Sequence, residues 1–163
     1  MQLARHAGLV PEEYEHLTYH VHAHLDVFVN GKQVMVPAGI GIDIRNRDVG
    51  SQGSSASLFY GLINTCSRPC ISPLHTHDTS GIMHTETSTP RPNTLGQFFT
   101  EWNRKLSSRC VASYCAPHTT VAFYVDGKRF KGNPRTILLA NHREIAVVIG
   151  KPPRYIPVAY NWG

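Results

Sequence analysis

The chain has 163 residues, of which 41% are hydrophobic and 17% charged, and its formal net charge is +5 with neutral histidines. This length is typical of one domain with its own core, and the apolar fraction excludes an intrinsically disordered chain. The basic residues are scattered and accompany no nucleic-acid motif, so we expect no nucleic-acid partner. No apolar run approaches about 18 residues, so we expect no membrane span. A single domain over residues 1–163 is the simplest interpretation.

The first strong pattern along the chain is a strand predicted at residues 19–29, where polar and apolar residues alternate. Residues two apart share one face of a strand, so His20, His22 and His24 lie on the same face. These three histidines span roughly 13 Å on a regular strand. One metal ion cannot contact all three of them, but an adjacent pair can bind one ion. A solvated strand face or a sheet edge is the alternative interpretation.

Two hairpins of similar sequence are predicted far apart in the chain, at Asn30-Gly31 and at Asp126-Gly127. Both dipeptides favour two-residue turns, and strand-like residues flank each of them. We therefore expect two related β-hairpins packed in one fold. Between them, residues 45–72 are rich in Gly, Ser, Asn and Arg, which predicts a long loop or insertion. The apolar residues 58–63 predict a short strand within it.

The four cysteines form two local pairs, Cys66 with Cys70 and Cys110 with Cys115. Their C-x3-C and C-x4-C spacings differ from the C-x2-C spacing of zinc knuckles and thioredoxin-like sites. We expect two disulfides that close small loops in an oxidising compartment. Buried free thiols in a cytosolic protein, or pairing between the two halves, are the alternatives.

The stretch at residues 74–84 is interpreted as a β-hairpin with a tight turn that begins at Asp78. In this hairpin His75 lies opposite His84, and His77 points to the same face. Cross-strand Cβ atoms on one face are roughly 4.5–5.5 Å apart. Because transition metals bind several imidazoles that converge from rigid backbone, the pattern predicts a three-histidine metal site. A solvated polar sheet face is the alternative.

One helix is predicted at about residues 94–106. Thr94 and Gln97 have the form of a capping box, which marks a helix N-terminus. Apolar residues follow at helical spacing and form a stripe that faces a core: Leu95, Phe98, Phe99, Trp102 and Leu106. The expected fold class is a β-rich α+β fold, with hairpins in an antiparallel sheet, small barrel or sandwich and one amphipathic helix.

The two histidine clusters are expected to share a site, because two histidine-rich strand faces in a small chain would otherwise each need a separate explanation. In one arrangement, a metal with an open position is bound by His75, His77 and His84, and one or two histidines of the first cluster line the pocket. In the other, an adjacent pair of the first cluster joins these three in a four- or five-nitrogen site, or forms a second site nearby. Asp78 and Glu86 are candidates to orient a ligand or to act as a general base. Each of these carboxylates also fits an ordinary turn or surface role.

Imidazole ligation in an oxidising compartment favours copper or zinc, and iron fits less well. The first functional hypothesis is an exported metal-binding protein with a role in metal binding or delivery. The second is a mononuclear metalloenzyme, of zinc hydrolase or lyase type or a copper or iron oxidoreductase, with a small-molecule substrate. The third is a β-type module that binds carbohydrate or protein and whose histidines are incidental.

Four strings together resemble a family of uncharacterised exported bacterial proteins: HAHLDVFVNGK at 22–32, SPLHTHDTSG at 72–81, TLGQFF at 94–99 and EIAVV at 144–148. The resemblance covers most of the chain from about His20 onward. It implies a secreted, periplasmic or cell-surface protein whose leader has been removed, which agrees with the expected disulfides; a cytoplasmic location is the alternative. It implies no particular activity. The chain departs from the family pattern in the Gly/Ser-rich stretch before Cys66.

Overall fold

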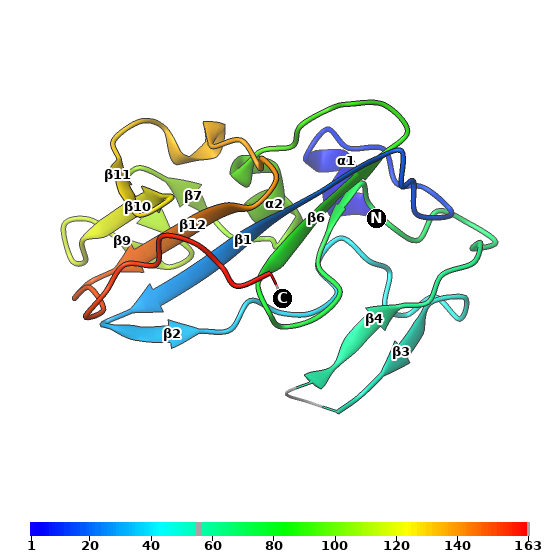
Figure 1. Ribbon diagram of the computed structural model, residues 1–163, viewed down its shortest axis with the longest axis horizontal. Helices are drawn as coiled ribbons and strands as arrows, with labels where there is room; N and C mark the ends of the chain where they lie inside the picture. The colour runs from blue at the N-terminus through cyan, green and yellow to red at the C-terminus, as the bar shows by residue number, and fades with distance from the viewer. Residues whose placement is uncertain (55–56, 163) are drawn as a thin grey trace.

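The computed structural model describes residues 1–54 and 57–162, and Figure 1 shows the arrangement of their helices and strands. The helical elements are α1 (Gln2–His6), α2 (Leu95–Glu101) and the 3-10 turn η2 (Pro134–Thr136). The strands are β1 (Tyr19–Val29), β2 (Lys32–Val34), β3 (Gly50–Gln52), β4 (Phe59–Gly61), β5 (Leu74–His75), β6 (Ile82–Thr87), β7 (Leu106–Ser107), β8 (Cys110–Val111), β9 (Tyr114–Cys115), β10 (Val121–Val125), β11 (Lys128–Phe130) and β12 (Arg143–Ile149).

The main sheet has 7 strands in the order β11-β10-β12-β1-β6-β5, with β2 paired to β1. Strands β1 and β12 are parallel, and the other neighbouring strands of this sheet are antiparallel. The described part of this sheet stays open and does not close into a barrel. The predicted β-rich α+β class is confirmed, and the one parallel pair makes the sheet mixed.

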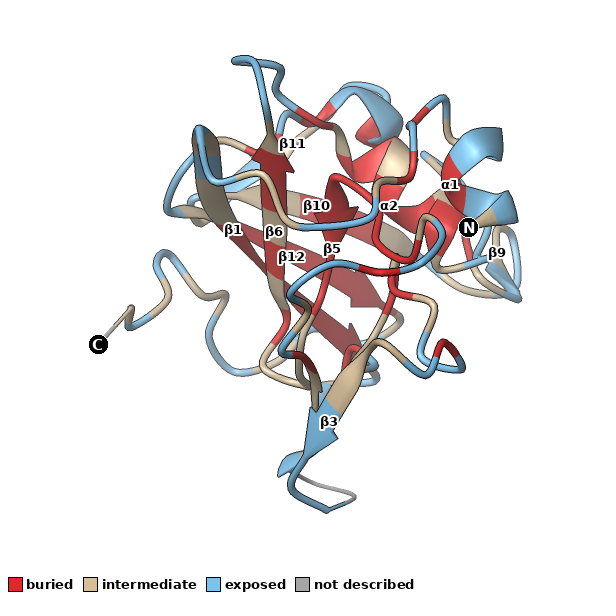
Figure 2. Ribbon diagram, turned by 90° about the vertical axis from the view of Figure 1, so that its right-hand side faces the viewer, coloured by how far each residue is buried: buried red, intermediate tan, exposed pale blue. Residues whose placement is uncertain are grey.

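The hydrophobic core lies between one face of the main sheet and helix α2. Alternate residues of β1 and β12, such as Leu25 and Ile145, point into it and meet Phe98 and Phe99 of the helix. Figure 2 shows this buried layer between the sheet and the helices. Fully burying a side chain of this size contributes roughly 1.5–3 kcal/mol. The intervening residues of the same strands point to the opposite face, where the histidines lie.

Helix α2 begins as predicted and ends earlier than predicted. The Thr94 side chain and Gln97 form the complete capping box. The helix ends at Glu101 instead of about residue 106, because Asn103 adopts a left-handed conformation with φ 53°. Asparagine tolerates this conformation and commonly terminates helices. Leu106 therefore belongs to strand β7, although its spacing fits the apolar stripe.

The two predicted turn dipeptides form hairpins in the main sheet. Asn30 and Gly31 have φ values of 51° and 80°, and Asp126 and Gly127 have 49° and 73°. Positive φ at both central residues defines the turn type that matches the twist of paired strands. The hairpins β1-β2 and β10-β11 flank β12 on its two sides.

Both local disulfides expected from the sequence are confirmed, Cys66–Cys70 and Cys110–Cys115. The predicted loop at 45–72 contains the β3-β4 hairpin, so the apolar patch does supply a strand. Residues 55–56 of this stretch lie outside the described part of the chain. Among the described residues, no helix has both the length and the apolar character needed to cross a membrane.

Candidate metal centre

The histidine hairpin forms only in part, between β5 and β6. His75 is opposite His84, as the alternation predicted. The expected tight turn is wrong, because β5 ends at His75 and its pairing with β6 does not extend to His77 and Ile82. The backbone of His77 turns away to strand β4, where its carbonyl accepts a hydrogen bond from the Tyr60 amide at 2.8 Å. A neighbouring strand of the fold thus replaces the hairpin partner.

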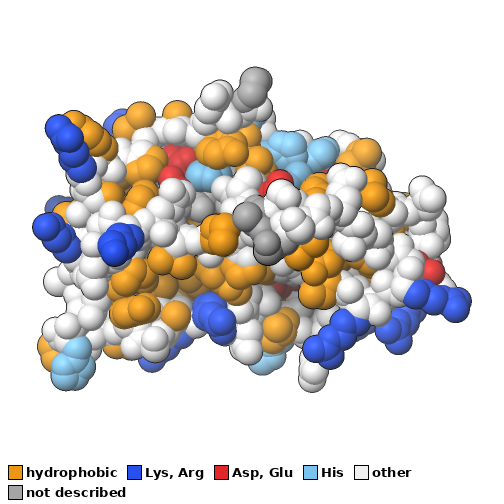
Figure 3. Space-filling view, turned by 90° about the horizontal axis from the view of Figure 1, so that it is seen from below, with side chains coloured by type: hydrophobic (Ala, Val, Ile, Leu, Met, Phe, Trp, Pro, Cys, Tyr) orange, Lys and Arg blue, Asp and Glu red, His pale blue; other side chains and the backbone are white. Residues whose placement is uncertain are grey.

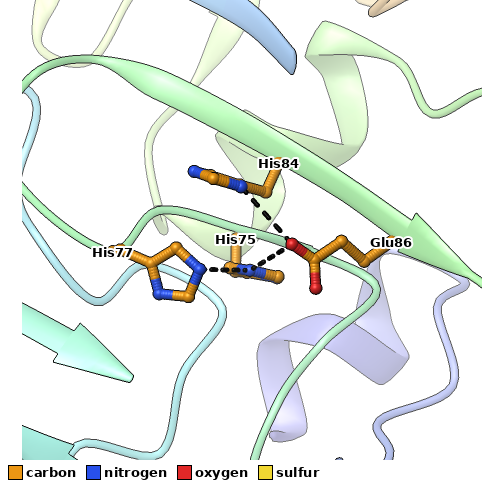
Figure 4. A group of neighbouring side chains, drawn as sticks. All are labelled: His75, His77, His84 and Glu86. Carbon is orange, nitrogen blue, oxygen red and sulfur yellow. Dashed lines mark hydrogen bonds and ion pairs between the residues drawn. The ribbon is translucent and has the colours of Figure 1, made fainter. Parts of the chain in front are cut away.

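His77 nevertheless converges with the other two histidines. His75, His77, His84 and Glu86 each offer a ligand atom, and these atoms lie within 4.8 Å of one another. The Nε2 atoms of His75 and His77 are 3.2 Å apart. Glu86 Oε1 lies 3.7 Å from His75 Nε2 and 3.4 Å from His84 Nδ1. Figure 4 shows the three rings and the carboxylate pointing toward one another. The predicted three-histidine set is therefore assembled in the structure, with Glu86 beside it.

Two backbone carbonyls determine how the rings of His75 and His77 are oriented. His75 Nδ1 donates to the Ser72 carbonyl at 2.9 Å, and His77 Nδ1 donates to the Tyr60 carbonyl at 2.6 Å. A carbonyl can only accept, so in each neutral ring the proton is on Nδ1 and the lone pair is on Nε2. The two Nε2 lone pairs then face each other, which is unfavourable unless a cation lies between them. Metal-binding histidines are oriented in the same way by hydrogen bonds to their second nitrogen.

Burial keeps the imidazole of His75 neutral and the neighbouring histidines keep Glu86 ionised. His75 is fully buried, and desolvation lowers its pKa to about 3. Burial also lowers the pKa of His84. For Glu86, burial by itself raises the pKa, but the hydrogen bond with His84 and the electrostatic interactions with the His75 and His20 rings outweigh it and lower the pKa to about 2. Near neutral pH, His75 and His84 therefore present neutral ring nitrogens beside an ionised Glu86.

The histidines of β1 lie next to strand β6, on the side opposite to β5. Strand β1 pairs with β6 so that His22 is opposite His84 and His20 is opposite Glu86. His20 Nε2 lies 2.7 Å from His22 Nε2 and 3.1 Å from Glu86 Oε1. Burial, followed by the charges of His84 and His20, lowers the pKa of His22 to about 4. His20, His22 and His84 form a second group with ligand atoms within 4.8 Å of one another.

His24, the third member of the β1 cluster, lies apart from the other histidines. Its Nδ1 is 2.8 Å from Glu144 Oε2, and its Nε2 is 2.8 Å from the Ser80 carbonyl. Both ring nitrogens face acceptors, which favours the doubly protonated imidazolium. Burial opposes this charge, but the hydrogen bond and charge of Glu144, with smaller contributions from Ser80 and Asp26, raise the pKa of His24. Its ring nitrogen lies close to carboxylate oxygens of Asp26 and Glu144, and these three residues form a separate group of possible ligands.

The two candidate carboxylates have different surroundings. Asp78 accepts a hydrogen bond from the Ser80 amide at 2.9 Å, as a turn residue does. Glu86 lies between the two histidine groups. Sequence reasoning missed Glu15, whose Oε1 is 3.8 Å from His77 Nε2. It also missed Glu144, because a carboxylate in a buried strand gives no local signal of its partner.

The Cys66–Cys70 loop supports this region. The amides of Cys66 and Cys70 donate to the carbonyls of Glu13 and Glu12 at 2.7 and 2.8 Å. Ser72, whose carbonyl orients His75, follows two residues later. Gly41 packs against the same strand with φ +77°, and a Cβ there would lie 2.3 Å from the Leu74 carbonyl oxygen. A side chain at this position would displace the strand that carries His75.

The C-terminal tail covers part of the histidine face. The Tyr160 ring stacks on His24 with centroids 4.0 Å apart. Trp162 stacks on His142 at 4.8 Å, and its centroid is 6.2 Å from that of His22. Figure 3 shows histidine side chains at the surface beside acidic side chains. The tail therefore contacts the β1 side of the site.

Comparisons with protein-family models, curated proteins and solved structures found no match. The fold and the donor set define a β-rich, disulfide-containing protein with histidine and carboxylate groups that could hold a metal ion.

Proposed function

We propose that this protein binds a transition metal ion, copper or zinc, through His75, His77 and His84 with Glu86 beside them. The observation that carries the proposal is the 3.2 Å approach of two Nε2 atoms whose rings are both oriented by backbone carbonyls. Tetrahedral zinc with bonds of about 2.0–2.1 Å places its ligand atoms roughly 3.3 Å apart. The observed 3.2 Å separation of the two Nε2 atoms is close to this distance.

Copper and zinc are proposed over iron because the donor set is mainly imidazole and the chain contains two disulfides. Disulfides are typical of oxidising compartments, which supports an exported protein. The resemblance to exported bacterial proteins agrees with this location. Binding or delivery of the metal outside the cytoplasm is the proposed role.

The direct test is the metal content of untagged protein, measured by elemental mass spectrometry before and after exposure to Cu(II) and Zn(II). His77→Ala is the informative variant because His77 offers a ligand atom to the group but is not one of the residues that form the hydrophobic core. His118→Ala is the matched control, since His118 is an exposed histidine that belongs to none of the three possible ligand groups.

We expect the wild type and His118→Ala to bind metal at His75, His77 and His84, and His77→Ala to bind the ion at this position at least 10-fold more weakly. A wild-type protein that binds neither ion would contradict the proposal. In that case the non-metal β-type binding module would become the leading hypothesis.

A further inference from the structure

Strand β6 lies between two strands that each bring a His-x-His pair to it. On one side, β5 places His75 opposite His84, with His77 two residues on. On the other side, β1 places His22 opposite the same His84, with His20 two residues before. His84 is therefore the central member of a row of three imidazoles that crosses three strands. The two sides of β6 repeat one arrangement, a His-x-His pair plus the shared His84. We call His75 and His77 the β5 flank and His20 and His22 the β1 flank.

On each side of β6 the ligand atoms lie within 4.8 Å of one another, and the two groups have only His84 in common. Ligand atoms around one ion with bonds of about 2.1 Å lie at most roughly 4.2 Å apart. His20 and His22 fall outside the group that contains His75 and His77, for which 4.8 Å is the limit. A single ion therefore does not collect all five imidazoles in this geometry.

Glu86 lies where a carboxylate between two ions would be needed. Its Oε1 is 3.1 Å from His20 Nε2 on the β1 side and 3.7 Å from His75 Nε2 on the β5 side. Its Oε2 is buried and makes no hydrogen bond to any described residue. One carboxylate is thus within reach of both flanks and still has a free oxygen.

We propose that the protein binds two transition metal ions, one on each side of β6, with His84 shared and Glu86 between them. This inference rests on the proposed function, because the ion at His75 and His77 is the first of the two. Two ions bound to the two nitrogens of one imidazole, with bonds of about 2.0–2.1 Å, lie roughly 6 Å apart. When the two nitrogens of His84 each contact an ion, the ring releases its remaining proton to solvent.

The stoichiometry tests the proposal. Untagged protein is freed of metal and titrated with Zn(II) by calorimetry, alongside His77→Ala and the double variant His20→Ala/His22→Ala. His20 is exposed and His22 half-buried, so their truncation leaves the core intact. His118→Ala is the control for loss of a surface histidine, and circular dichroism checks the fold of each variant.

We expect two equivalents for the wild type and His118→Ala, and one equivalent for either flank variant. In the Cu(II)-loaded wild type, the paramagnetic signal should integrate to fewer than two spins because nearby ions couple. A variant of one flank should restore one full spin. This spectroscopic result holds even if affinities change in the variants.

One equivalent in the wild type, unaffected by His20→Ala/His22→Ala, would overturn the two-ion proposal and leave the single-site function standing. One equivalent that requires both flanks would show a single five-nitrogen site, which also overturns it. No binding at all would remove the proposed function together with this inference.

Discussion

His75 and His77 face each other through Nε2 atoms 3.2 Å apart, while the Nδ1 atom of each ring donates to a backbone carbonyl. This arrangement concentrates lone pairs in a buried position, so a bound cation should stabilise the folded protein. At free zinc about 100 times the dissociation constant, the expected gain is about 2.7 kcal/mol. Thermal unfolding with and without zinc measures it. His118→Ala should retain the gain, and an equal gain in His77→Ala would rule out this site as its source.

The Cys66–Cys70 disulfide should support metal binding more than the Cys110–Cys115 disulfide does. The first closes a loop that hydrogen-bonds Glu12 and Glu13 and precedes Ser72. The second joins strands β8 and β9 of a separate small sheet. Loss of groups that orient metal ligands typically costs 10- to 100-fold in affinity. We expect about a 10-fold loss of zinc affinity in Cys66→Ser/Cys70→Ser.

The matched control is Cys110→Ser/Cys115→Ser, which removes a local disulfide of similar loop length. Both double variants should lose thermal stability, but only the first should lose metal affinity. Equal affinities in the two variants would show that the first disulfide does not orient the site.

Trp162 should report on an ion at the β1 side of the site. Its ring lies 6.2 Å from that of His22, whereas Trp102 packs against Phe98 and Phe99 in the core. Cu(II) quenches the fluorescence of nearby indoles, so copper should quench Trp162 first. We expect Trp162→Phe to lose most of the quenching and Trp102→Phe to keep it. The reverse pattern would place the copper elsewhere.

Glu101 should make the protein less stable as the pH rises. Glu101 is 5% exposed, and burial raises the pKa of its carboxyl group from an ordinary 4.5 to about 8. The folded state then binds more protons than the unfolded state between these two values, so this stabilisation is complete below about pH 4.5 and is lost as the pH rises through 8. The slope is about 1.4 kcal/mol per pH unit.

Glu101→Gln removes this titration while keeping the shape of the side chain. Its free energy of unfolding should exceed that of the wild type by a few kcal/mol near pH 9, with the difference shrinking toward pH 5. Chemical denaturation across this pH range measures the difference. Parallel curves for the two proteins would show that the carboxyl does not titrate in this window.

Local sequence determined the short-range features of the fold and of the site. The period-2 alternation places His75, His84 and Glu86 on one face because successive strand residues point to opposite sides. The Asn-Gly and Asp-Gly dipeptides determine their hairpins through positive φ values, and the Thr94 capping box determines where the helix begins. These features depend on neighbouring residues, so a single sequence is enough to predict them.

Only the tertiary structure decided which strands lie next to each other. The parallel pairing of β1 with β12 joins segments more than a hundred residues apart and places His24 opposite Glu144, away from the other histidines. The pairing of β1 with β6 places His22 opposite His84. The contact with Tyr60 moves His77 out of its hairpin and back toward His75. Such pairings depend on how the whole sheet packs, and the alternation within one strand contains no information about its partner.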